Sequence, residues 1–409
     1  MSLDDVKQPH PERKFLLGTL TFGHTVIHWY QQMFPVFLPM IKADLGLSAV
    51  QVGGLMTAKQ GASGLLTLPS GFAADAFNKH KATILGSALM IGGLAYVVAS
   101  VAPTYFWILV FLTMLGAASA LWHPSSVSTL SLQFSDRRGT AIALHGVGAS
   151  IGDSVGPLCI GAMLLVVGWK DLAQWHLIPA LILAFLMWRT VRQHYSAGSG
   201  GLTRRSYFSG IKGIFARPTV FMVMIASSFV GMARLSVTTF LPLYLAEEMN
   251  YDSFWLGFHW ALLYAMGVFS QPLMGILSDK FSRKTVLLPS FATMGILYLL
   301  LPMPGGGFLL ALIIAAMGMF FYGTGNIATA AVLDVASEQV QGTTQSFMTL
   351  FQQVVTLPAP IVAGFVVSHY GYATVFYYSS ALLFSAAVVW AFIRIPKRAA
   401  GTGGGGGGS

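Results

Sequence analysis

A few ionisable side chains lie inside long apolar stretches of this 409-residue sequence. A charged side chain at the centre of a bilayer costs on the order of 2.5–3.5 kcal/mol, so each such residue is a candidate for function. They are Lys59, Asp153, Arg234, His24, His28, His123, His145 and His259. Two strong cations against one carboxylate favour an anionic substrate. Arg234 is the best candidate to hold it, because a planar guanidinium presents paired N–H donors to a carboxylate or phosphonate.

These residues and neighbouring amides predict a transport site. The predicted substrate site comprises Arg234, Lys59, His28, His24, Gln31, His123, Asn326 and Gln352. The predicted proton carriers are Asp153, His28 and His145, because histidine titrates near neutral pH and Asp153 is the carboxylate of the set. Two alternatives stay open. Lys59 and Asp153 could pair with each other, leaving substrate preference to Arg234, and any single buried histidine could serve packing alone.

Polar side chains recur at helical spacing within four of the apolar stretches, so that each set shares one helix face. The sets are His24, His28, Gln31 and Pro35; Lys59, Ser63, Thr67 and Ser70; Ser227, Gly231, Arg234 and Thr238; and Gln345, Thr349, Gln352 and Thr356. Such faces predict a wet interior shared by several helices. They could instead hold helices together, although contacts of that kind seldom need lysine or arginine.

The stretches that carry these residues predict a membrane protein. Hydrophobic residues make up 55% of the chain and charged residues 9%, against about 25% charged residues in soluble domains. Apolar runs of about 20 residues match the thickness of a bilayer as helices, and they lack the alternation of barrel strands. We predict an all-α protein with twelve spans, the first of them retained and not cleaved as a signal peptide. Their ranges are 15–41, 50–74, 82–102, 105–132, 140–168, 172–193, 218–246, 253–277, 285–303, 307–336, 343–368 and 373–394.

The chain carries a net charge of +9, and its basic residues are distributed unevenly between the loops. Most of the 23 lysines and arginines fall in one set of loops, whereas Lys42, Lys170 and the acidic residues Glu247 and Glu248 fall in the other. Cytoplasmic loops are enriched in lysine and arginine. We therefore expect a multi-pass protein of the bacterial inner membrane with both termini in the cytoplasm, and a basic charge that serves topology and not nucleic-acid binding.

A polar segment divides the chain into two halves. We predict a six-helix bundle over residues 1–193, a cytoplasmic linker over 194–217, a second six-helix bundle over 218–398, and a linker or tag remnant over 399–409. Within 194–217, apolar residues recur beside basic ones, which indicates either a short amphipathic helix or a disordered linker. Landmarks such as Pro39 and Pro157 reappear half a chain later as Pro242 and Pro360, which indicates duplication.

Two loops resemble a family signature. The segments GFAADAFNKHK, from Gly71, and GILSDKFSRK, from Gly275, resemble the G-x-x-x-D-R/K-x-G-R-K/R motif of the major facilitator superfamily. The first copy departs from it at Ala76 and Asn78, and the second at Ser282. The resemblance implies the major facilitator fold, two pseudo-symmetric six-helix bundles that transport by alternating access. It also implies gating residues, which here are Asp75, Asp279, Lys280 and Arg283.

The segment LHGVGASIGDSVGPLCIG, from Leu144, resembles the antiporter motif of drug-efflux members, although Gly161 stands later than the usual glycine. Together with WHPSS, from Trp122, and RGTAIALHGVGASIGDSVGP, it resembles the fosmidomycin-resistance branch, from which Ser125 departs by replacing an acidic residue. This implies efflux and adds Gly152, Gly156 and Pro157 to the gating residues.

Other functional classes fit the sequence less well. No G-x-x-x-x-G-K-S/T motif occurs, so transport must be driven by a gradient or run downhill. A membrane-embedded metal enzyme is disfavoured, because His24 and His28 lack an intervening glutamate, and the single cysteine, Cys159, excludes a thiolate metal site. We therefore expect a monomeric transporter, not an enzyme, without cofactor or metal, that exports a small organic anion in exchange for protons. Proton-coupled import of an organic anion is the alternative.

Overall fold

The computed structural model describes residues 11–76, 78–193, 218–335 and 341–393, which fold into helices. The first half contains α1 (Pro11–Leu45), α2 (Ala49–Ala76), the 3-10 turn η1 (Asn78–His80), α3 (Lys81–Ser100), α4 (Tyr105–Gln133), α5 (Arg138–Met163), α6 (Trp169–Trp175) and α7 (Leu177–Arg192). The candidate amphipathic segment within 194–217 lies outside the described residues.

The second half repeats this series with more interruptions. It contains α9 (Pro218–Leu243) with the π-helical turn η2 (Tyr244–Glu248), α10 (Ser253–Lys280), α11 (Arg283–Leu300), α12 (Phe308–Phe321), α13 (Gly323–Val335), α14 (Gln341–Thr356), α15 (Ala359–Tyr370) and α16 (Tyr372–Phe392). The helix starts follow local chemistry where polar caps are present. Asp252, for example, caps α10 by accepting a hydrogen bond from the Trp255 backbone N–H at 2.9 Å.

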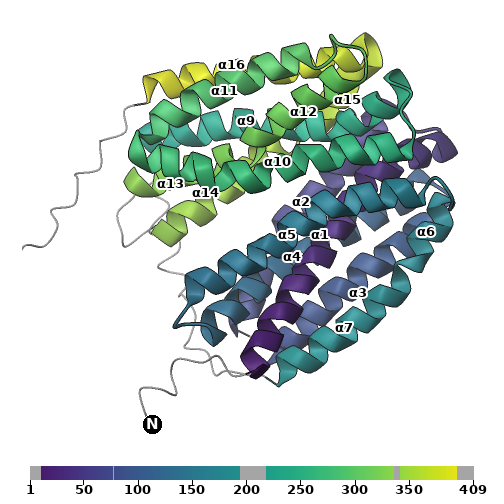
Figure 1. Ribbon diagram of the computed structural model, residues 1–409, viewed down its shortest axis with the longest axis vertical. Helices are drawn as coiled ribbons and strands as arrows, with labels where there is room; N and C mark the ends of the chain where they lie inside the picture. The colour runs from purple at the N-terminus through teal and green to yellow at the C-terminus, as the bar shows by residue number, and fades with distance from the viewer. Residues whose placement is uncertain (1–10, 77, 194–217, 336–340, 394–409) are drawn as a thin grey trace, which may run out of the picture.

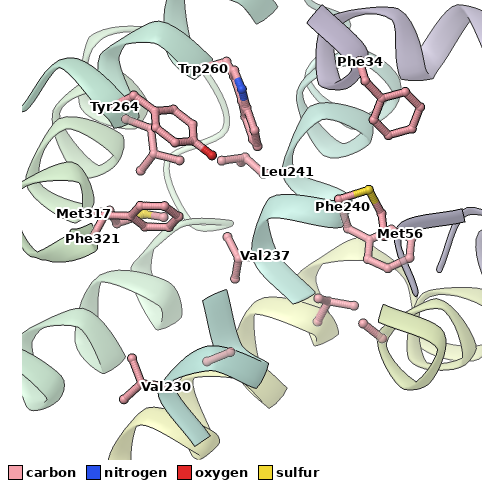
Figure 2. Packing of buried hydrophobic residues seen from close by; sticks show 14 of the residues in the cluster. Phe34, Met56, Val230, Val237, Phe240, Leu241, Trp260, Tyr264, Met317 and Phe321 are labelled. Carbon is pink, nitrogen blue, oxygen red and sulfur yellow. The ribbon is translucent and has the colours of Figure 1, made fainter. Parts of the chain in front are cut away.

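The helices pack as two groups, α1–α7 and α9–α16, which lie one above the other in Figure 1. Contacts between the groups run mainly through α5 against α10 and α2 against α15. The largest buried apolar cluster crosses this boundary, since it includes Phe34 and Met56 from the first group and Phe240 and Trp260 from the second (Figure 2). Each group therefore presents an inner face to the other, and that boundary is where a site shared by both can form.

Among the described residues, eight helical segments are long and apolar enough to cross a membrane. The helices α1, α2, α5 and α11 are not among these segments. The first three carry the polar residues that the sequence singled out, among them His28, Lys59 and Asp153, and α11 begins with Arg283 and Lys284. Their lower hydropathy thus comes from polar side chains, which α1, α2 and α5 direct in part toward other helices. The chain is a multi-pass membrane protein, and the count of twelve spans stays a prediction.

A break in one helix shapes the site. α12 ends at Phe321 and α13 begins at Gly323, which leaves Tyr322 between them. The last carbonyls of a helix have no partner within it, so they are free to accept hydrogen bonds from elsewhere. At this break the Phe321 carbonyl accepts a hydrogen bond from Arg234, and the Tyr322 hydroxyl donates one to Asp153 of the first group.

Candidate functional site

Two cavities lie at the boundary between the two groups of helices. The larger, of about 410 Å³, is lined mainly by α9, α13 and α14. The smaller, of about 260 Å³, is lined by α1, α2, α4 and α5 together with residues of the second group. Gln60, Arg234 and Tyr264 line both cavities. Arg234 therefore lies where the two spaces meet.

Arg234 is held in place by a backbone carbonyl and two aromatic rings. Its Nη1 atom donates to the Phe321 carbonyl at 2.9 Å, and its guanidinium carbon lies 4.3 Å above the centre of the Phe321 ring and 5.8 Å from that of Tyr322. A guanidinium stacks favourably on aromatic faces. Among the described residues, no carboxylate lies within ion-pair distance of it. The arrangement orients a cation toward the cavities and leaves it free to bind an anion.

Lys59 supplies a second positive charge on the smaller cavity. In the part of the chain that the structure describes, its ammonium group makes no ion pair or hydrogen bond. The pairing of Lys59 with Asp153, which the sequence left open, is not found, because Asp153 pairs with His28 instead. Lys59 and Arg234 thus both face the smaller cavity as cations.

Asp153 is the centre of a buried hydrogen-bond network. Only 3% of the residue is exposed, and it accepts from His28 Nδ1 at 2.9 Å, Gln32 Nε2 at 2.8 Å and the Tyr322 hydroxyl at 2.7 Å. A buried carboxylate is costly unless such donors surround it. The three donors come from α1 and from the break between α12 and α13, so this carboxylate connects elements far apart in sequence.

The same network joins the two groups of helices. Tyr322 belongs to the second group and Asp153 to the first, and the Gln32 side-chain oxygen also accepts from Trp260 Nε1 of α10 at 2.8 Å. Sequence reasoning missed Gln32, Trp260 and Tyr322. Gln32 follows His28 by four residues, a spacing that could have placed it on the same helix face. Nothing in the sequence pattern distinguishes Tyr322 or Trp260 from other aromatic residues of apolar stretches.

Four histidines of the first group form a cluster beside this network. His24 stacks on His145 with ring centres 4.0 Å apart, and the His28 and His123 rings lie 4.7 and 5.3 Å from His24. One ring nitrogen from each of His24, His28 and His123 lies within 4.8 Å of the others. These three residues are the described histidines that could hold a metal ion together. The cluster borders the smaller cavity through His28 and His123.

The remaining predicted substrate residues separate into two sets. Gln31 lines the smaller cavity and donates to the Leu115 carbonyl at 2.9 Å, and Gln352 lines the larger and donates to the Ser227 carbonyl at 3.0 Å. Asn326 lines neither cavity and donates to Gln271 at 3.1 Å. His259 also lies outside both, with Nδ1 2.7 Å from the Trp255 carbonyl.

The predicted gating residues of the second group lie at the turn between α10 and α11. Asp279 pairs with Arg283 at 2.6 Å across the turn from α10 to α11, and the Lys280 ammonium lies 5.4 Å from the centre of the Phe281 ring. This arrangement fixes a turn within the second group. The Asp75 side chain lies outside the part that the structure describes.

The glycines of α5 allow close approach of neighbouring helices. Gly152 lies against the backbone of α1 at Thr25, and Gly156 lies against Trp29. The Pro157 carbonyl faces Gly257 of α10, so this part of α5 also forms the boundary with the second group. The gating role of Gly152, Gly156 and Pro157 stays a prediction.

An ion pair at one end of the molecule also joins the two groups. The Lys42 ammonium, at the end of α1, lies 2.7 Å from Glu247 Oε1, and the Tyr372 hydroxyl donates to Glu247 Oε2 at 2.7 Å. Nearby, the Ser253 hydroxyl donates to the Gly161 carbonyl at 2.9 Å. Sequence reasoning used Lys42 and Glu247 only to assign loops to a side of the membrane, because charge counts carry no information on pairing.

The chain is similar to known transporters along most of its length. The sequence profile described as Major Facilitator Superfamily matches residues 20–360 and, again, 267–408. The chain is 23% identical to the fosmidomycin resistance protein of Escherichia coli over 70% of each chain. It is 25% identical to a protein of Cupriavidus necator named "Probable sulfoacetate transporter SauU", over 95% of each chain. Among solved structures, a bacterial homolog of the human lysosomal transporter Spinster shares the fold, with a TM-score of 0.76, 17% identity, and coverage of 94% of this chain and 97% of that one.

Proposed function

Because the chain belongs to the major facilitator superfamily, we propose that it is a secondary transporter that exports a small organic anion through a site between its two groups of helices. The observation that carries the proposal is Arg234, an oriented guanidinium without a carboxylate partner among the described residues, where two cavities meet. Lys59 adds a second cation to the same space. One similar protein is named for sulfoacetate, an organic anion, which supports this substrate class.

In the proposed mechanism, anion binding at Arg234 is coupled to a hydrogen bond between the two groups of helices. An anion bound at Arg234 lies next to Tyr322, whose ring is stacked near the guanidinium and whose hydroxyl donates to Asp153 of the other group. Binding at Arg234 is therefore able to change the strength of a contact between the groups. In this scheme twelve spans, including the more polar α1, α2, α5 and α11, form two six-helix bundles that rock around the site.

We propose export in exchange for protons across the bacterial inner membrane, with both termini in the cytoplasm. The distribution of lysine and arginine supports this orientation. The resemblance of the Leu144–Gly161 segment to an antiporter motif, and the similarity to a resistance protein, favour export over import. Proton-coupled import of an organic anion is the second candidate, and vesicles of defined orientation with an imposed pH gradient distinguish the two.

Substitution of Arg234 tests the substrate site. Arg234→Gln removes the charge and the planar pair of N–H donors. We therefore expect the binding free energy of the anion to weaken by on the order of 1.5–3 kcal/mol, the value of one hydrogen bond to a charged group. Arg234→Lys keeps the charge but loses the planar pair of donors, so we expect transport to fall markedly. A panel of phosphonates, carboxylates and sulfonates, tested by thermal stabilisation of purified protein, identifies a ligand for these measurements.

The matched control is Arg138→Gln, because Arg138 is exposed and donates to the Ser131 carbonyl of its own group of helices. This variant should bind and transport as the unsubstituted protein does. A well-folded Arg234→Gln protein with unchanged binding and transport would contradict the proposal and leave Lys59 as the anion-binding residue. Low melting temperatures in both Arg234 variants would instead show that the arginine serves folding.

A further inference from the structure

We propose that His24, His28 and His123 form a binding site for a divalent transition-metal ion inside the first group of helices. The site is distinct from the anion site at Arg234 and does not depend on the proposed direction of transport. Imidazole is a favoured ligand for Zn²⁺, Co²⁺ and Ni²⁺. His24 and His28 come from α1 and His123 from α4, so an ion bound here would connect these two helices.

The hydrogen bonds of the three rings leave the same nitrogen available on each. Nδ1 of His24 lies 2.9 Å from the His145 carbonyl, that of His28 lies 2.9 Å from Asp153, and that of His123 lies 2.7 Å from the Ser119 carbonyl. Carbonyl and carboxylate oxygens accept hydrogen bonds, so each Nδ1 carries the proton and donates. The Nε2 lone pairs remain free. Metal-binding histidines are oriented in this way by carboxylate and carbonyl partners.

The Nε2 atoms of His28 and His123 are close enough to share a cation. Nε2 of His28 and Nε2 of His123 lie 3.4 Å apart, and two lone pairs at that distance repel unless a proton or a metal ion lies between them. Two nitrogen ligands of a tetrahedral zinc ion, each at about 2.0–2.1 Å from it, are separated by roughly 3.4 Å. The observed separation already fits that geometry.

His24 provides the third ligand and the second, independent observation. The residue is 7% exposed, and its Nε2 atom is buried without a hydrogen-bond partner among the described residues. An unpartnered buried nitrogen is costly, and a metal ion would satisfy it. One ring nitrogen of each of His24, His28 and His123 already lies within 4.8 Å of the others. Small side-chain rotations would therefore complete the site.

The surroundings suit a metal ion with one position open. Three imidazoles leave a tetrahedral ion one ligand short. His28 and His123 line the smaller cavity, from which water or an anion could supply that ligand. Asp153 lies directly behind His28 and offsets part of the added charge, whereas Lys59 and Arg234 on the same cavity oppose it. An ion bound here would add positive charge beside the space in which the anion is proposed to bind.

A metal site at these histidines was not expected from sequence reasoning. That reasoning considered His24 and His28 as a pair on one helix and found no glutamate between them. His123 lies almost a hundred residues away in sequence, and only the packing of α4 against α1 brings it to the pair.

Metal binding to the purified protein tests the site without any measurement of transport. The full chain is prepared in detergent without a polyhistidine tag, stripped of metal with a chelator, and titrated with Zn²⁺ by calorimetry and with Co²⁺ by visible absorption. We expect one ion per chain, a Co²⁺ spectrum of tetrahedral type, and a higher melting temperature with Zn²⁺. His24→Ala and His123→Ala should each weaken binding by at least about tenfold, the lower limit even for loss of an outer partner.

His259→Ala is the matched control. His259 is buried and its Nδ1 contacts the carbonyl four residues earlier, as His123 does, but it lies outside the cluster. This variant should bind Zn²⁺ as the unsubstituted protein does. If His123→Ala folds poorly, His123→Gln keeps a side chain of similar length and should show the same weakening. Absence of stoichiometric binding, or equal affinity in the His123 and His259 variants, would overturn the proposal and indicate that a proton is shared by His28 and His123.

Discussion

Two tyrosines of the second group differ in the hydrogen bonding of their hydroxyl groups. Tyr322 donates to Asp153 at 2.7 Å, whereas the hydroxyl of Tyr298, a fully buried residue, has no hydrogen-bond partner among the described residues. Both are tyrosines of the second group, and both could be replaced by phenylalanine without a change of ring shape. Their comparison isolates the bond to the carboxylate.

We expect Tyr322→Phe to destabilise the folded protein by about 1.5–3 kcal/mol, because it removes a hydrogen bond to a buried charged group. Tyr298→Phe should have little effect or stabilise slightly, since it removes an unpaired hydroxyl. Thermal unfolding of the two variants in the same detergent gives the comparison. Equal melting temperatures would show that the Asp153 carboxylate finds another donor when the hydroxyl is absent.

From the sequence, candidate site residues could be selected by residue type, but their contact partners could not. Buried ionisable residues are rare in apolar helices, so Arg234, Lys59 and Asp153 could be selected from their type alone. Which of them pair depends on helix packing, and so Asp153 was not matched with Gln32 or Tyr322. The Phe321 carbonyl that orients Arg234 is available only because a helix ends there, and a backbone group has no signal in side-chain pattern.

At the scale of helices, hydropathy and spacing located most elements but not their interruptions. The predicted range 307–336 is divided into α12 and α13, and 343–368 into α14 and α15. Gly323 follows the first break and Pro358 precedes α15, and both residue types permit a break without requiring one. Polar residues at helical spacing singled out the stretches that form α1, α2, α9 and α14. Of these, α1 and α2 are less apolar than the eight segments long and apolar enough to cross a membrane, as are α5 and α11, whose ranges were predicted from apolar runs.

The glycines of α5 give a prediction about helix packing. A Cβ atom added at Gly152 would overlap the Thr25 carbonyl oxygen of α1, whereas one added at Gly146 of the same helix meets nothing within 4 Å. We expect Gly152→Ala to destabilise the protein by about 1–3 kcal/mol, because α1 and α5 must separate. Gly146→Ala should be neutral or stabilise by up to about 1 kcal/mol. Thermal unfolding measures both, and similar values would show that α1 can shift freely.

At the scale of the molecule, several contacts between the two groups lie where α1 ends and α2 begins. Lys42 pairs with Glu247 there, Gly364 of α15 packs against Ala49, and Gly161 of α5 packs against Ser253. In the proposed orientation this end faces the periplasm. The structure therefore represents a state in which that end is closed.

Opening of this end should depend on the pair of Lys42 and Glu247. Partly exposed ion pairs contribute about 0.2–1 kcal/mol, and 1 kcal/mol changes the ratio of two conformations by roughly fivefold. Glu247→Gln should raise the population of the open state by up to that factor, because it removes the charge that Lys42 contacts. The reporter is Ala49→Cys, a buried position at this end, in a Cys159→Ser background, labelled with a membrane-impermeant maleimide.

Lys170→Gln is the control for this measurement, because Lys170 pairs with Asp44 at 3.0 Å within the first group and so does not join the two groups. Labelling of Ala49→Cys should increase with Glu247→Gln, remain unchanged with Lys170→Gln, and return toward its initial rate when Lys42→Glu and Glu247→Lys are combined. The label should reach this cysteine from the periplasmic side if the assigned orientation is right. Equal labelling in the Glu247 and Lys170 variants would mean that the apolar contacts between α2 and α15 alone keep this end closed.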